Sequence, residues 1–251
     1  MRAFIKSITF AATGLALAAC GSGSSGGDEG PVVTPPPPPP AAMRSFEVTL
    51  TNLTLAQPLS PPAIFLHTSD YSAFADGFTA SEAIEILAEG GDRSNLITEV
   101  TDANALLAAY QDDNPVPPLS RSVTEQLTFP EADAADIRLT TVTMLVHTND
   151  AFTGINAADI TSMEVGDTRT FNGPTWDAGT ENNTENAATM PGPDFGGEGF
   201  NPARDDIIDR VRFHQGVVTA ASAESGDPNS ALEERHRFDN PSSRLVITRV
   251  E

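Results

Sequence analysis

Short strand-like segments, separated by turn-forming residues, recur along most of this chain and constrain its fold more than any other feature. Phe46, Val48 and Leu50 alternate with polar neighbours, which is typical of a strand with one buried face. The runs at 137–146 and 244–250 are rich in β-branched residues. Many short strands between proline, glycine and asparagine turns favour an antiparallel β-sandwich, so we predict an all-β fold.

A small helical insertion is expected after the second strand, which we place at 63–67. Thr79 and Glu82 have the spacing of a capping box, in which each side chain bonds the other residue's backbone N–H. Apolar residues follow at helical spacing, and the glycine at Gly90 is typical of a helix end. A second helical piece is predicted around 102–110.

The first residues of the chain, 1–19, have the features of a lipoprotein signal peptide. Arg2 and Lys6 provide the positive start, and residues 8–19 form an apolar stretch that is too short to span a bilayer. Small residues then lead to the single cysteine, Cys20, in a pattern that resembles a bacterial lipobox. We expect cleavage before Cys20 and lipid attachment to it; the alternative is an ordinary secretory peptide that is cut elsewhere.

The next segment, 20–43, is expected to be a tether that starts at the lipidated Cys20. It is rich in glycine and serine and contains an uninterrupted proline run, which favours an extended polyproline helix. The residue after the cysteine is Gly21 rather than the aspartate that would indicate inner-membrane retention, so in a cell with two membranes we expect the outer one. Residues 44–251, about 208 in number, are enough for one domain with its own core.

The chain is strongly acidic, with a formal net charge of −21. Removal of Arg2 and Lys6 with the signal peptide leaves 12 basic residues against 35 acidic ones, a net charge of −23. Such a surface repels nucleic acid and anionic membranes, so no nucleic-acid partner is expected, and it attracts divalent cations.

Two short acidic clusters lie where predicted strands end. Asp150 follows the apolar run 142–146, and Asp177 and Glu181 frame a turn. Three carboxylates on adjoining loops suit a hard cation such as Ca²⁺, which takes roughly six to eight oxygen ligands. The alternative is that these residues are solvated turns of an acidic protein, since Asp and Gly are turn residues in any case.

Such a cluster of carboxylates needs a counter-charge. Three nearby carboxylates repel one another unless they are protonated, solvated or paired with a cation. Arg169 is the only basic residue between Asp150 and Asp177, and we place it on a strand away from both. A divalent ion is then the simplest counter-charge; Mg²⁺ keeps more of its own water, and Zn²⁺ prefers His or Cys.

Several segments together resemble the spondin N-terminal domain family over about residues 45–250. The segments that carry the resemblance are Ser60-Pro61-Pro62, His67–Ser72, Ala80–Glu82, Ala88–Gly91, Thr148–Gly154 and Asp177–Glu181. The resemblance implies a C2-like β-sandwich whose loops bind Ca²⁺. Carried over by position, the ligands would be Asp150, Asp177 and Glu181.

The chain departs from the animal members of that family in two ways. It has no cysteine in the folded domain, so it lacks their disulfides. Glu181 also stands where their motif usually has Asp. Glutamate is longer by one methylene and often binds Ca²⁺ through both oxygens. Its carboxylate oxygens would therefore lie at a different position but could still bind the ion.

Other chemistry is less well supported by the sequence. The four histidines are too scattered for a zinc motif, and we expect His67 and His147 to be hydrogen-bonded structural residues. A glycan hydrolase could use Asp150 and Asp177 as acid and base. However, the chain contains only two Tyr and one Trp to stack on sugars, and we expect Trp176 to belong to the core.

We therefore expect a non-enzymatic, lipid-anchored, Ca²⁺-binding adhesion or interaction domain in the cell envelope. Its expected partners are the membrane, through Cys20, and an extracellular glycan or protein. Two alternatives remain: a surface glycan hydrolase that uses the same acidic loops, and a structural envelope lipoprotein without a ligand.

Overall fold

The computed structural model describes residues 38–121, 125–133, 135–202, 208–221 and 228–251. Residues 40–251 form one compact unit. The predicted signal peptide, Cys20 and the predicted tether as far as residue 37 lie outside the described residues. None of the described helices is long and apolar enough to cross a membrane.

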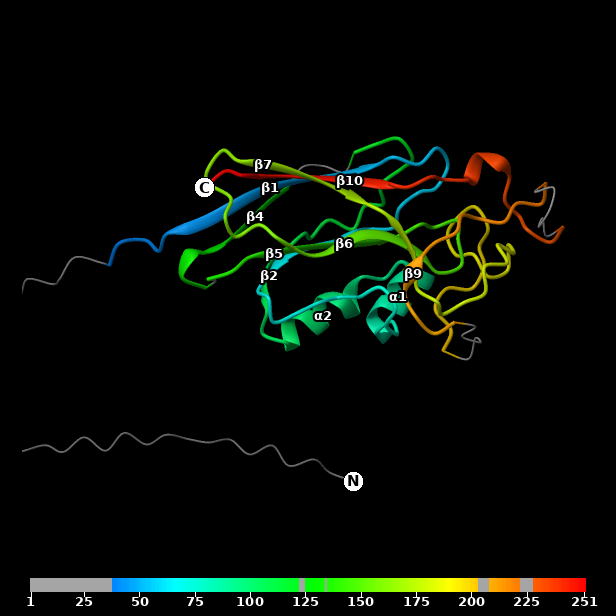
Figure 1. Ribbon diagram of the computed structural model, residues 1–251, viewed down its shortest axis with the longest axis horizontal. Helices are drawn as coiled ribbons and strands as arrows, with labels where there is room; N and C mark the ends of the chain where they lie inside the picture. Colours follow the sequence, from blue (N-terminus) through cyan, green and yellow to red (C-terminus); the bar gives the residue numbers. More distant parts are fainter. Residues whose placement is uncertain (1–37, 122–124, 134, 203–207, 222–227) are drawn as a thin grey trace, which may run out of the picture. The chain divides into compact units, whose positions relative to one another are not determined.

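Two antiparallel sheets make up most of the fold and confirm the predicted all-β sandwich (Figure 1). The four-stranded sheet has the order β4-β1-β10-β7 and consists of β1 (Met43–Asn52), β4 (Glu125–Pro130), β7 (Thr168–Gly173) and β10 (Ser243–Arg249). The six-stranded sheet has the order β3-β2-β5-β6-β8-β9 and consists of β2 (Ala63–His67), β3 (Leu106–Ala109), β5 (Arg138–Met144), β6 (Ala151–Asp159), β8 (Thr175–Asp177) and β9 (Arg212–Phe213).

The main core lies between the two sheets. Phe46, Val48 and Leu50 all point into it, which confirms the alternation read from β1. Leu66 of β2 and Ile247 of β10 belong to the same cluster and are fully buried. Burying one such side chain stabilises the fold by about 1.5–3 kcal/mol, so this alternation sets which face of the four-stranded sheet turns inward.

A second core lies on the other face of the six-stranded sheet, under helices α1 (Glu82–Gly90) and α2 (Ser94–Asp102), which form a third layer (Figure 1). Phe65 and Phe152 of the sheet pack there with Leu87 and Leu96 of the helices. Because β2 lies between both cores, all five of its residues are buried. The predicted helical insertion after the second strand is therefore present.

The start of the first helix differs from the prediction. Ser81, not Thr79, is the N-cap, and its hydroxyl accepts the Ile84 N–H at 3.3 Å. The Thr79 hydroxyl instead donates to the Asp209 carbonyl at 3.3 Å. A contact between residues 130 positions apart thus replaces the local capping box.

The second helix was predicted too late in the chain. It covers Ser94–Asp102, and Leu106–Ala109, which we expected to be helical, is strand β3. Leucine and alanine favour helix, but this segment pairs antiparallel with β2, where Phe65 faces Ala109 and Leu66 faces Ala108. Pairing with a fully buried strand outweighs the small difference in intrinsic propensity.

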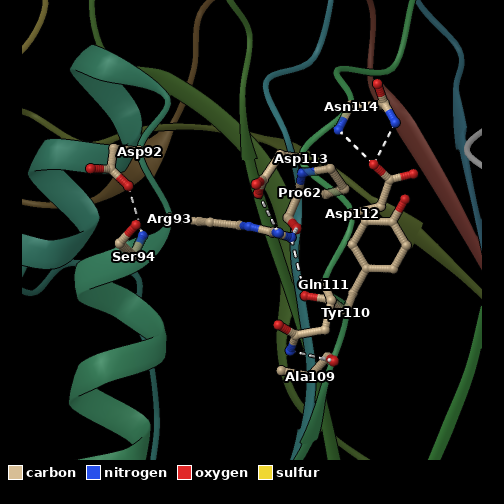
Figure 2. A network of polar contacts seen from close by, with 10 residues as sticks. All are labelled: Pro62, Asp92, Arg93, Ser94, Ala109, Tyr110, Gln111, Asp112, Asp113 and Asn114. Atoms are coloured by element: carbon tan, nitrogen blue, oxygen red, sulfur yellow. Dashed lines mark hydrogen bonds and ion pairs between the residues drawn. The ribbon is translucent and has the colours of Figure 1, made fainter.

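Arg93 ties the helical layer to the sheet (Figure 2). Its guanidinium donates to the carbonyls of Pro62 and Tyr110 at 2.7 and 3.2 Å and pairs with Asp113 at 2.7 Å. It also lies 5.6 Å from the centre of the Tyr110 ring. One side chain at the start of α2 therefore fixes the ends of β2 and β3 relative to that helix.

Candidate metal centre

Asp150 lies at the end of the turn that joins β5 to β6. Thr148 shapes this turn, because its hydroxyl donates to the Leu145 carbonyl at 2.6 Å and accepts the Ala151 N–H at 3.1 Å. Asp150 is completely buried. The sequence placed an acidic residue after an apolar strand, and the structure puts its side chain inside the protein instead of in solvent.

Asp177 is brought next to Asp150 by strand pairing. It is the last residue of β8, where it faces Ala151 of β6, and the Ala178 N–H donates to the Asp150 carbonyl at 3.2 Å. Asp177 is 1 % exposed. The two aspartates are 27 positions apart in the sequence, and the β6–β8 pairing makes them neighbours.

The turn after Asp177 wraps around the Asp150 carboxylate. Oδ2 of Asp150 accepts the N–H groups of Thr180 and Glu181 at 2.9 and 3.1 Å. Gly179 has φ of +79°, and a Cβ there would lie 2.2 Å from the Ile208 carbonyl oxygen. Only glycine fits this position, because both the left-handed backbone and the close approach exclude a side chain.

Asp177 has a counter-charge from the protein itself. Its Oδ2 accepts from Arg212 Nη2 at 2.9 Å and from Asn183 Nδ2 at 2.9 Å. Arg169 is the only basic residue between Asp150 and Asp177 in the sequence, but the structure supplies Arg212 from further along the chain. Arg212 lies on β9, and pairing with β8 places it directly opposite Asp177.

Burial and like charge disfavour a second ionised group at this site. Desolvation raises the pKa of Asp150 to about 7, and the neighbouring Asp177 carboxylate acts in the same direction. Its two backbone hydrogen bonds act in the opposite direction but are outweighed. His214 is also buried here, and desolvation lowers its pKa to about 4 although Asp177 acts in the opposite direction. Its Nδ1 accepts the Gly216 N–H at 3.0 Å.

Four buried oxygens of this site have no hydrogen-bond partner among the described residues. They are Asp150 Oδ1, Asp177 Oδ1, Thr180 Oγ1 and Asn183 Oδ1. A buried polar atom without a partner costs about 1–3 kcal/mol, so such atoms rarely gather without a reason. Carboxylate and side-chain amide oxygens are also the ligands that Ca²⁺ prefers.

Glu181, the third predicted ligand, is in place through its backbone. Its N–H holds Asp150, and the residue is 6 % exposed. Within the described ranges, no three His, Cys, Asp or Glu side chains form a group that could hold a metal. The structure thus brings Asp150 and Asp177 together and adds neutral oxygens to them, but it does not assemble three carboxylates.

Sequence reasoning missed several residues of this site. Thr180 and Asn183 follow within a few positions of Asp177, and an oxygen-bearing residue just after an acidic turn is a weak signal that could have found them. Arg212 and His214 lie more than 30 positions after Asp177, and no local pattern connects them to the turn.

The other candidate residues are placed as structural. His67 bonds the Thr68 carbonyl at 2.7 Å and the Thr140 hydroxyl at 2.8 Å. His147 bonds the Ala56 carbonyl at 3.1 Å and Asp194 at 2.9 Å. Trp176 packs against the second core and stacks on Phe213 with the ring centres 4.4 Å apart.

A comparison with known families gives a match that covers the acidic loops of the candidate site. The family model described as Spondin_N matches residues 59–194, a range that includes Asp150, Asp177 and Glu181. This range is shorter than the resemblance at 45–250, and β1 and β10 fall outside it. A comparison with curated proteins found no match.

Proposed function

The chain belongs to the spondin N-terminal domain family, and from that premise we propose that it is a non-enzymatic, lipid-anchored surface domain whose loops bind Ca²⁺. Family membership indicates an extracellular or interaction domain. The finer assignments, namely Ca²⁺, the lipid anchor, the outer membrane and adhesion to a glycan or protein, are our proposal.

The observation that carries the calcium proposal is the set of four buried oxygens without hydrogen-bond partners on two adjoining loops. Asp150 and Asp177 would supply charged ligands, and Thr180 and Asn183 neutral ones. Arg212 balances one of the two carboxylates. A divalent ion would balance the other carboxylate and would keep Asp150 ionised near neutral pH.

Burial of the site suggests how the ion would act. Asp150 and Asp177 are 0 % and 1 % exposed, so a partner could not readily reach an ion between them. An ion at this depth would therefore offer no open coordination position to a partner. Ca²⁺ would instead lock the turns at 148–150 and 177–183, and through Arg212 it would fix the neighbouring Phe213, which is 54 % exposed.

The same burial weighs against the hydrolase alternative. An acid–base pair in glycan hydrolysis must reach the glycosidic oxygen and a water molecule. Asp150 has the raised pKa of a general acid, but its carboxylate is enclosed by the turn that donates to it. We propose a metal-stabilised interaction domain for this reason.

The test is a calorimetric melt of the purified chain with Ca²⁺ or with chelator. Ca²⁺ at about 100 times its Kd stabilises the folded state by about 2.7 kcal/mol. In a domain of this size that raises Tm by roughly 5–10 °C. Asp150→Asn should abolish this shift, whereas Glu164→Gln, which removes one exposed carboxylate elsewhere, should keep it. An equal Ca²⁺ shift in Asp150→Asn would refute the site.

The lipid anchor is tested separately. Metabolic labelling with a fatty acid should mark the wild-type chain and leave Cys20→Ala unlabelled, and the wild type should fractionate with the outer membrane. Label that persists in Cys20→Ala would contradict attachment at that residue. Two or more acyl chains anchor a protein stably, so the unlabelled variant should also leave the membrane fraction.

A further inference from the structure

A row of polar side chains crosses the outer face of the four-stranded sheet. Thr51 of β1 is bridged to Arg121 on one side and paired with Arg244 of β10 on the other, and Arg244 is paired with Asn172 of β7. The neighbours Leu50 and Leu245 are buried in the core. Since side chains alternate along a strand, the whole row faces outward.

The two arginines of this row lack the ion pairs that most other arginines form. Arg244 donates only to Asn172 Oδ1, at 3.3 Å, and neither guanidinium is paired with a carboxylate among the described residues. Six other arginines do form such pairs: Arg44, Arg93, Arg138, Arg212, Arg235 and Arg237. In a chain with 35 acidic and 14 basic residues, two neighbouring unpaired arginines are unexpected on charge alone.

Both arginines line one groove on this face of the sheet. It has a volume of about 330 Å³ and is lined by Thr49, Thr51, Arg121, Arg244 and Val246. Among the residues that the structure describes, no acidic side chain lines it. Neighbouring strands lie about 4.8 Å apart, so the backbones of Arg121 and Arg244 are roughly 10 Å apart across Thr51, and two long side chains can converge on one group between them.

We propose that this groove binds an oxyanion, in the class of phosphate or carboxylate, attached to a small neutral group such as a sugar. Guanidinium is planar and offers paired donors that match phosphate and carboxylate oxygens. The Thr51 hydroxyl adds a donor between the two arginines. The volume is roughly that of ten water molecules, which leaves room for the group that carries the anion.

The site is independent of the proposed calcium site. It lies on the four-stranded sheet and shares no residue with Asp150, Asp177 or the turn between Gly179 and Asn183. The strong negative charge of the rest of the chain repels anions, so we expect weak binding that depends on this local pair and weakens further with added salt.

The experiment is a calorimetric titration of the full chain at low ionic strength with inorganic phosphate, glucose 1-phosphate and glucose. Wild type should bind at least one of the two phosphates with Kd near 1 mM and should not bind glucose. Preference for glucose 1-phosphate would identify a sugar-borne anion, and equal binding would identify a site for the oxyanion itself. Failure of wild type to bind either phosphate would overturn the proposal.

Arginine variants distinguish binding in this groove from nonspecific attraction of the anion to positive charge. Arg121→Gln and Arg244→Gln should each weaken binding at least tenfold. Arg244→Lys, which keeps the charge but loses the paired donors, should fall between wild type and Arg244→Gln. Arg237→Gln removes an equal charge from an exposed position outside the groove and should bind like wild type, provided that melting curves are unchanged. An equal loss in Arg237→Gln would overturn the proposal.

Discussion

Asp150 accepts the backbone N–H of Glu181 at 3.1 Å, so a residue expected to bind a cation with its side chain is held to the first aspartate by its main chain. The turn between Asp177 and Glu181 thereby closes over the Asp150 carboxylate. One oxygen of that carboxylate is fully used by two N–H groups, and the other has no partner. The chemistry of this end of the sandwich depends on that difference between the two oxygens.

The raised pKa of Asp150 predicts how stability changes with pH. Unfolded, this carboxyl titrates near its ordinary value of 3.8; folded, burial and Asp177 raise its pKa to about 7. Between these values the folded state holds a proton that the unfolded state has lost, so in chelator the contribution of Asp150 to stability should fall as pH rises from 4 to 7 and then level off. Chemical denaturation of wild type and Asp150→Asn measures this as the difference in unfolding free energy between the two, which should change in favour of the variant as pH rises.

Calcium should show the opposite dependence on pH. The ion needs the ionised carboxylate, so the Ca²⁺-induced rise in Tm should grow as pH increases through the pKa of Asp150, at about 7. Melts with and without Ca²⁺ at several pH values give this directly. A rise in Tm that is the same on both sides of that pKa would show that Asp150 is not a ligand.

Gly179 and Gly77 offer a matched pair for the turn. Both have left-handed backbone, with φ of +79° and +82°, but a Cβ at Gly179 would meet the Ile208 carbonyl at 2.2 Å whereas one at Gly77 would meet nothing within 4 Å. Gly77→Ala should cost about 1–2 kcal/mol of unfolding free energy. Gly179→Ala should cost clearly more, about 3 kcal/mol or above, because crowding adds to the strain. Similar costs in urea melts would contradict the close packing at Gly179.

Arg93 should contribute more to stability than its partner Asp113. Arg93→Ala removes three hydrogen bonds and leaves the carbonyls of Pro62 and Tyr110 without this donor (Figure 2), which should cost about 2–4 kcal/mol. The Asp113 side chain is 88 % exposed, so Asp113→Asn should cost less than about 1 kcal/mol. Urea denaturation gives the free energy of unfolding of both variants. Equal losses would mean that the exposed ion pair with Asp113 supplies most of the stabilisation by Arg93.

Gln57 should be a strongly destabilising site although it lies in a loop. It is fully buried, its Nε2 donates to the carbonyls of His147 and His236, and its Oε1 accepts the His147 N–H at 3.1 Å. Gln57→Leu keeps the side-chain volume but leaves these backbone groups without hydrogen-bond partners. The free energy of unfolding should fall by about 2–5 kcal/mol. The exposed Gln126→Leu is the control and should change stability by less than about 0.5 kcal/mol. A small effect of Gln57→Leu would show that water replaces the amide.

The sequence predicted the sheets better than the helices. Alternation in β1 indicated which residues are buried, because burial on a strand repeats every second residue and needs no knowledge of the partner. The helical piece expected at 102–110 failed because leucine and alanine are compatible with either structure, and the choice was made by pairing with β2. The capping box at Thr79 failed for a similar reason, since Asp209 offered a distant acceptor.

For the candidate site, the sequence by itself determined that acidic residues follow two strands and that a glycine lies in the second turn. Only the tertiary structure decided that Asp150 and Asp177 are neighbours, that their free oxygens are buried, and that Arg212 neutralises one of them. The physical reason is that turns and alternation are set by residues a few positions apart. Counter-charges and burial depend on strands that are distant along the chain and meet only when the sheet has formed.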